Sequence, residues 1–208
     1  MHWRLSVLSL GLTLIAVAQV AHQEHPPRSA GEYARVLEDP GRDEWQKPHE
    51  VVMALKLRPD EVIADIGAGT GYFSRRFARH AGKVLAVDID ANLLAIAAKD
   101  APPNLETVLA TPDDPKLAPK SIDTVFFCDV LHHIENRPAY YAKLKSALKP
   151  GGRLVVVDFH KRPLPVGPPP AMKVAMEEVQ REMKSAGFHE TESFGMLSHQ
   201  YFLVFQYN

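Results

Sequence analysis

The stretch Val62-Ile63-Ala64-Asp65-Ile66-Gly67-Ala68-Gly69-Thr70-Gly71-Tyr72-Phe73 decides the fold of this chain. Its first five residues form a short apolar run, which is typical of a strand covered on both faces. Three glycines follow at alternate positions, and from residue 71 to 81 the apolar residues recur at helical spacing. A strand, a glycine turn and a helix in this order place a small polar ligand at the carboxyl end of the strand.

The glycine spacing distinguishes between two kinds of nucleotide site. A dinucleotide fold uses G-x-G-x-x-G, whose third glycine lets the helix pack closely on the strand. Here the spacing is G-x-G-x-G, and Tyr72 stands where that third glycine would be. Asp65 before the turn would repel a pyrophosphate and suits a cationic group better. From the residues alone, a tight strand–helix turn that binds no ligand is the alternative.

Asp65 and the glycines resemble motif I of the class I S-adenosylmethionine-dependent methyltransferases, D-x-G-x-G-x-G. The resemblance covers residues 42 to 206. It implies an α/β fold with a Rossmann-like seven-stranded sheet, a last strand that runs antiparallel, and helices on both faces. It also implies S-adenosyl-L-methionine as the cofactor. The residues it places against the cofactor are Asp65, Gly67, Ala68, Gly69, Thr70, Gly71, Tyr72, Asp88, Ile89, Thr111, Pro112 and Asp129.

Asp88 ends the second predicted strand, over residues 83–88, and follows Gly67 at the distance expected of a carboxylate that binds a ribose. An ionised carboxylate offers two acceptor oxygens, one for each ribose hydroxyl. The alternative role is the N-cap of the next helix, over residues 91–99, but Asp90 can fill that position.

The third predicted strand, over residues 105–109, leads into a turn-forming segment. In the methyltransferases an acidic residue for the adenine amino group is common here, and Thr111 stands in its place. Thr111, Pro112 and Asp113 are therefore either adenine contacts or simple turn residues.

The fourth predicted strand, within residues 121–134, ends at Asp129, where the reacting methyl group would lie. His132 and His133 follow, and together with Asp129 they are the candidate catalytic residues, because a histidine can act as a base near neutral pH. Capping or helix packing is the alternative for both histidines. No metal site is predicted, since adjacent histidines point to different helix faces and no third ligand is suitably spaced. Cys128 is expected to be a core residue of the strand.

The remainder of the chain completes the sheet. A helix over residues 137–149 is expected to reverse at Lys149-Pro150-Gly151-Gly152 into a strand over residues 153–159. A proline-rich loop, a helix over residues 171–186 and two strands over residues 190–194 and 201–206 follow. A plain dinucleotide fold would not end in such a hairpin.

The N-terminal residues predict export. Arg4, an apolar run to residue 18 and a final Ala-Val-Ala indicate a secretory signal over residues 1–18, or an uncleaved membrane anchor. Residues 19–41 are predicted to be a flexible lead with a helix over 31–37, and residues 42–208 the methyltransferase domain. Trp45 is either a lid over the ligand or a packing residue. The predicted location is periplasmic or secreted, with membrane association through the N-terminus as the alternative.

Composition narrows the partners. The chain has 208 residues, a net charge of −1 and one cysteine, so it has no overall basic character for nucleic acid and no intrachain disulfide framework. A small-molecule substrate is expected, and the oligomeric state stays open.

The resemblance therefore predicts methyl transfer from S-adenosyl-L-methionine to a small, apolar or lipid-like acceptor. Two alternatives remain: a ligand-binding or interaction protein without activity on the same fold, and a nicotinamide-dependent oxidoreductase.

Overall fold

The computed structural model describes residues 30–207 of the chain. The predicted signal segment and flexible lead over residues 1–29 lie outside the described residues. Within residues 30–207, no helix is both long and apolar enough to cross a membrane.

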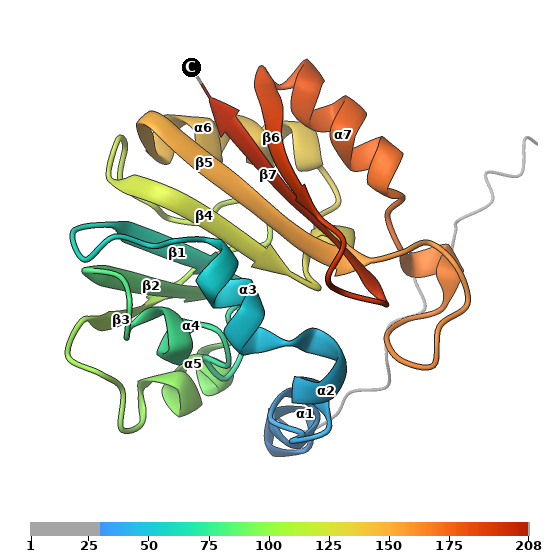
Figure 1. Cartoon of the computed structure of the whole chain (residues 1–208). Coiled ribbons are helices and arrows are strands. Elements are labelled where there is room, and N and C mark those ends of the chain that lie inside the picture. The colour runs from blue at the N-terminus through green and yellow to red at the C-terminus, as the bar shows by residue number, and fades with distance from the viewer. Residues whose placement is uncertain (1–29, 208) are drawn as a thin grey trace, which may run out of the picture.

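One seven-stranded sheet organises the described residues (Figure 1), with the strand order β3-β2-β1-β4-β5-β7-β6. The strands are β1 (Val62–Ile66), β2 (Lys83–Asp88), β3 (Leu105–Leu109), β4 (Ile122–Cys128), β5 (Leu148–Phe159), β6 (Phe188–Phe194) and β7 (Gln200–Tyr207). Strands β1 to β5 pair in parallel, and β7 pairs antiparallel with both β5 and β6. This confirms the predicted sheet and its antiparallel last strand.

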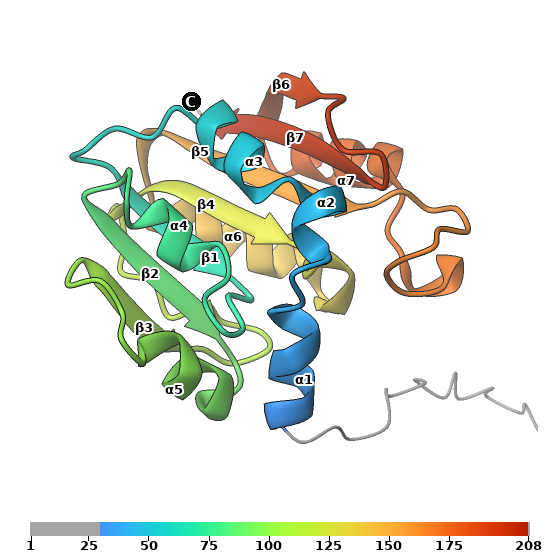
Figure 2. The same ribbon diagram turned by 60° about the horizontal axis from the view of Figure 1, so that its bottom comes forward.

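Helices cover both faces of this sheet. They are α1 (Ala30–Leu37), α2 (Arg42–Gln46), α3 (Pro48–Ala54), α4 (Ser74–Phe77), α5 (Ala91–Ala98), α6 (Arg137–Ala147) and α7 (Met176–Ser185), with 3-10 turns at Leu131–His133 and Pro170–Met172. In Figure 1, α3, α4 and α5 lie in front of the sheet, and α6 and α7 lie behind it. Helices α1 and α2 lie beyond the arrowhead of β4 (Figure 2).

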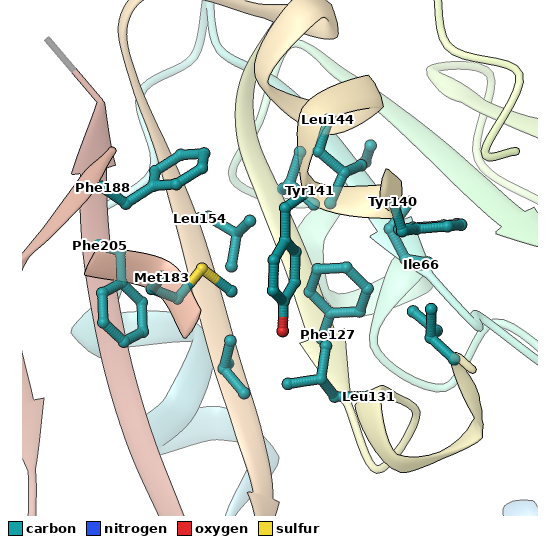
Figure 3. Packing of buried hydrophobic residues seen from close by; sticks show 14 of the residues in the cluster. Ile66, Phe127, Leu131, Tyr140, Tyr141, Leu144, Leu154, Met183, Phe188 and Phe205 are labelled. Carbon is teal, nitrogen blue, oxygen red and sulfur yellow. The ribbon is translucent and has the colours of Figure 1, made fainter. Parts of the chain in front are cut away.

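The sheet separates two apolar clusters. Behind it, Tyr141 of α6 and Met183 of α7 pack on Phe127 and Leu154 (Figure 3). In front, Phe77 of α4 packs with its ring 4.9 Å from that of Phe126. Successive residues of β4 face opposite sides of the sheet, and both sides are covered by apolar clusters. The sequence of β4 is therefore a continuous apolar run over its last four residues. Cys128 is buried in the front cluster, as predicted.

Three predicted elements differ from the structure. The helix expected over residues 71–81 is regular only at Ser74–Phe77, with turns on either side. The helix expected from residue 171 begins at Met176. The strand expected from residue 153 begins at Leu148, which pairs with Ile122, and the segment over residues 149–152 is an irregularity within it, with Gly151 at φ +75°.

Candidate active site

The glycine turn after β1 lies against residues from distant segments. Gly67 has φ +70°, and a Cβ there would lie 2.2 Å from a methyl carbon of Val130, so only glycine fits without a shift. Gly69 has φ +56°, and a Cβ would lie 2.8 Å from Leu37 of α1. The N–H groups of Gly67 and Ala68 both donate to the carbonyl of Val87, which fastens the turn to the end of β2.

Asp88 joins the end of β2 to this turn. Its Oδ2 accepts the N–H of Gly69 at 2.7 Å, and its Oδ1 accepts the N–H of Asp90 at 2.9 Å. Asp90 is the N-cap of α5, as predicted, so Asp88 is not needed for that role. The next residue, Ile89, is a large apolar side chain that is 60% exposed. A carboxylate beside an uncovered apolar side chain can hold a sugar and the flat ring attached to it.

Asp65 lies under the turn and is buried. Its Oδ2 accepts the hydroxyl of Ser74 at 2.6 Å. Burial raises the pKa of this carboxyl from 3.8 to about 7, while the Ser74 hydrogen bond and the nearby Arg42 lower it. Within residues 30–207 no cation lies at salt-bridge distance from this buried carboxyl, so Asp65 is suited to a cationic ligand group.

Tyr72 ends the turn between two arginines. The guanidinium carbons of Arg42 and Arg76 lie 4.1 Å and 4.0 Å from the centre of its ring, and its hydroxyl donates to Asp43. Burial and the Asp43 hydrogen bond raise the pKa of Tyr72. The residue where a dinucleotide fold would have glycine is thus held between side chains of α2 and α4.

Asp129 directly follows β4, has φ +59°, and its side chain is 18% exposed. Its Oδ1 accepts the Gln200 amide at 2.5 Å, and its Oδ2 lies 3.9 Å from the Arg42 guanidinium. The Gln200 carbonyl oxygen in turn accepts the Gln46 amide at 2.6 Å. Burial and the neighbouring Asp158 raise the pKa of Asp129, and Arg42 lowers it.

His132 is paired with a carboxylate at the same edge of the sheet. Its Nδ1 lies 3.2 Å from Oδ1 of Asp158, at the end of β5, and both side chains are almost fully buried. A carboxylate at one ring nitrogen orients the imidazole and leaves Nε2 to take a proton. His133 is exposed and stacks beside it, with ring centres 4.2 Å apart. Of the two histidines, the structure brings His132 to the candidate catalytic carboxylates.

Thr111 and Pro112 lie at the end of β3 in an exposed turn. The turn closes through two backbone hydrogen bonds between Thr111 and Asp114, and the Thr111 hydroxyl donates to Asp113 at 2.8 Å. Their role as adenine contacts stays a prediction, and the turn itself accounts for their residue types.

Burial raises the pKa of the Cys128 thiol, and the neighbouring Asp129 adds to this effect. The thiolate is therefore disfavoured, which agrees with a core residue. Trp45 packs 5.7 Å from the ring of Phe159 and 6.4 Å from that of His199, so it lies against the ends of β5 and β7.

A cavity of about 220 Å³ adjoins this group of residues. It is lined by His160, Met176, Ser193, Phe194, Gly195, Leu197, Gln200, Tyr201 and Phe202. Because Gln200 both lines the cavity and donates to Asp129, the cavity lies beside the candidate catalytic carboxylate. A cavity of about 350 Å³ at the opposite edge of the sheet is lined by Arg58, Glu61 and Arg153. There the buried Glu61 is neutralised by Arg153 at 3.0 Å, so we do not assign it to the active site.

Sequence reasoning missed three residues of this site and the pairing of a fourth. Arg42 and Gln46 stand in the same segment as Trp45, but no spacing rule connects them to the glycine turn. Gln200 carries a weak signal, as an amide at the start of an otherwise apolar strand. Asp158 lies in a predicted strand, but its pairing with His132 becomes visible only when β4 and β5 lie side by side.

Known proteins similar to this chain are consistent with the geometry. A family model described as a methyltransferase domain matches residues 64–156. Phosphoethanolamine N-methyltransferase 1 of Arabidopsis thaliana is 24% identical over 157 residues, covering 71% of this chain and 30% of that protein. Demethylmenaquinone methyltransferase of Tropheryma whipplei is 35% identical over 107 residues, covering 50% of this chain and 44% of that protein. The chain therefore spans less than half the length of these two curated relatives.

Among solved structures, one described as a SAM-dependent methyltransferase from Aquifex aeolicus has a TM-score of 0.81 at 20% identity. The match covers 88% of this chain and 100% of that one. At this identity the likeness shows the fold.

Proposed function

We propose that this chain, which belongs to the class I S-adenosylmethionine-dependent methyltransferases, transfers the methyl group of S-adenosyl-L-methionine to a small acceptor with apolar or lipid-like character. The observation that carries the proposal is the meeting of the glycine turn, Asp88 and the exposed Ile89 at the carboxyl edge of the sheet. Open α/β sheets bind their ligands in this place, outside the carboxyl ends of the strands.

The residues present fit this cofactor. Asp88 offers carboxylate oxygens for the ribose hydroxyls, and Ile89 offers an apolar surface for the adenine. The turn over Gly67 to Gly71 allows the backbone to lie close to the ligand, and the buried carboxyl of Asp65 favours a cationic group. When bound, the cofactor supplies an electrophilic methyl group on a sulfonium.

The chain's own contribution to the reaction is alignment and proton handling. Holding donor and acceptor in reacting geometry lowers the barrier by several kcal/mol. For an acceptor that loses a proton, we assign His132 as the base, oriented by Asp158 at 3.2 Å. The proton passes to Nε2, and the buried Asp158 stabilises the imidazolium that forms.

The acceptor class is supported by the cavity of about 220 Å³ beside Gln200, whose lining includes Phe194, Tyr201 and Phe202. Such a cavity has room for a single ring or a short alkyl chain, since an engineered apolar cavity of about 150 Å³ holds benzene. The net charge of −1 gives the chain no general attraction for polyanions.

Methyl transfer from isotope-labelled S-adenosyl-L-methionine to small thiols, phenols, amines, quinones and lipids tests this proposal. Label should appear in at least one small acceptor, and Asp88→Ala should lower the rate at subsaturating cofactor. Tight binding of the cofactor with no transfer to any acceptor would instead favour a ligand-binding protein on the same fold.

We also propose export of the chain through residues 1–18 to the periplasm or beyond, on the strength of their sequence pattern. Mass spectrometry of the N-terminus of the protein from its native cell tests this. An intact N-terminus in the cytoplasmic fraction would contradict it.

A further inference from the structure

Carboxylates outnumber cations in the part of the site where the acceptor would bind. Three carboxylates, Asp65, Asp129 and Asp158, lie at the ends of β1, β4 and β5, and all three are at least four-fifths buried. Arg42 is the cation that reaches into this group, and it approaches Asp129 no closer than 3.9 Å. Lys173 also acts electrostatically on Asp158, but its ammonium donates to the carbonyl of Arg162.

Asp129 is the carboxylate of this group that a ligand can reach. Its side chain is 18% exposed, whereas Asp65 and Asp158 are 3% and 0% exposed. Oδ1 accepts the Gln200 amide at 2.5 Å, and Oδ2 accepts the Cys128 thiol at 3.6 Å and forms an ion pair with Arg42 at 3.9 Å. Because a thiol is a weak donor and a carboxylate oxygen has two lone pairs, Oδ2 can accept a further hydrogen bond from a ligand.

One molecule can fill the cavity with one end and contact Oδ2 of Asp129 with the other. Gln200 lines the cavity of about 220 Å³ and also holds Asp129. Asp129 does not itself line the cavity, but Gln200 joins the two, so an acceptor whose apolar body enters the cavity would have its head group on the side of Asp129. The apolar side chains of this mixed lining and the carboxylate would then contact different ends of the same molecule.

The charge of the head group follows from electrostatics. A thiolate, phenolate or carboxylate acceptor would be repelled by Asp129 and Asp158, and its desolvation among them would be costly. An amine is attracted as the ammonium ion, and positive charge appears on its nitrogen as the methyl group arrives. Carboxylates fixed on that side stabilise this developing charge.

We infer that the acceptor is an amine with an apolar body, held at its nitrogen by Asp129 and methylated there. This inference rests on the proposed methyltransferase function and names its substrate class. The bound ammonium first passes a proton to Nε2 of His132, which Asp158 orients. The neutral amine then attacks the methyl carbon, so that the N–C bond forms while the C–S bond breaks, and the positive charge moves from sulfur to nitrogen. The product leaves as the methylated ammonium ion.

Matched acceptors that differ only in the reacting atom test the inference. With the full chain and labelled S-adenosyl-L-methionine, we would compare phenethylamine, phenethyl alcohol and phenethyl mercaptan, and the corresponding hexyl compounds. The amine of each set should be methylated at least about tenfold faster than its oxygen and sulfur analogues. Asp129→Asn keeps the shape and an acceptor for Gln200 but removes the charge, and should lower kcat/KM for the amine by at least about tenfold.

Glu192→Gln is the control for this variant, because it removes the same charge from an exposed position on β6 and should leave the rate unchanged. Preferred methylation of the alcohol or thiol, or an Asp129→Asn variant as fast as the wild type with the amine, would overturn the inference and leave the methyltransferase function standing. Failure of the wild type to bind the cofactor would remove both.

If none of these compounds is methylated, the affinity of the protein for each of them tests the inference instead. Calorimetry of each acceptor with the protein saturated with S-adenosyl-L-homocysteine should then show tighter binding of the amine than of its analogues, lost in Asp129→Asn. Amine binding that is equal to or weaker than that of the alcohol in both sets would overturn the inference.

Discussion

At the scale of single residues, the site depends on carboxyl groups that are held away from water. Asp65 is 3% exposed, and its hydrogen-bond partner is the neutral hydroxyl of Ser74. Asp88 is different, because two backbone N–H groups donate hydrogen bonds to it and orient it. The burial of the Asp65 carboxylate costs desolvation free energy, which a cationic ligand group would offset.

This difference predicts a pH dependence of stability. With a pKa near 3.8 unfolded and about 7 folded, Asp65 binds its proton more tightly in the folded state. Its contribution is therefore favourable below pH 4 and is lost as the pH rises to about 7, a change on the order of 4 kcal/mol. Urea unfolding of the ligand-free protein at several pH values should show a flatter profile for Asp65→Asn than for the wild type between pH 4 and 7. Parallel profiles would contradict the assignment.

The adjacent histidines form an internal comparison. His132 is paired with Asp158, whereas His133 is exposed beside it. With an acceptor that loses a proton, His132→Ala should lower kcat by about 10²- to 10⁴-fold, the usual contribution of a general base. His133→Ala should change kcat by much less, and neither change should alter the cofactor Kd. Steady-state kinetics with calorimetry measures both; a full rate in His132→Ala would show that His132 is a packing residue.

At the scale of elements, the strands were the predictable part of the fold. Apolar runs such as residues 62–66 and 83–88 mark buried parallel strands directly, and their bounds agree with the structure. Helix lengths were less predictable, since α4 is regular only at Ser74–Phe77. The start of β5 was also missed: Leu148 pairs with Ile122 ahead of the Pro-Gly-Gly segment, and the register shifts before Arg153 pairs with Thr124.

The glycine turn gives the sharpest prediction for an element. Gly67→Ala places a Cβ against Val130 at a positive φ, and should destabilise the fold by about 2 kcal/mol or more. For a domain of this size, that corresponds to a fall in melting temperature of roughly 4–8 °C. Gly31→Ala is the control, because nothing lies within 4 Å of a Cβ built at residue 31 in α1. This substitution should leave the stability unchanged or raise it slightly. Equal melting temperatures for Gly67→Ala and wild type would refute the steric argument.

At the scale of the whole molecule, the site is closed by the two ends of the described chain. Leu37 of α1 lies over Gly69, and Glu38 forms an ion pair with Arg75 at 2.8 Å. Gln46 of α2 bonds to Gln200 of β7 across 154 residues of sequence. Contacts between residues so far apart in the sequence produce no recognisable pattern in it. The residues of the glycine motif were therefore predictable, whereas Arg42, Gln46 and Gln200 were not.

The central claim is that the carboxyl edge of the sheet binds S-adenosyl-L-methionine through the glycine turn and Asp88. Titration of the protein with S-adenosyl-L-methionine and S-adenosyl-L-homocysteine in a calorimeter tests it most directly. We expect saturable binding at one site, and a rise in Kd of roughly 5- to 150-fold in Asp88→Ala, from the loss of about 1–3 kcal/mol of charge-assisted hydrogen bonding. Absence of binding to the wild type, or an unchanged Kd in Asp88→Ala, would contradict the account.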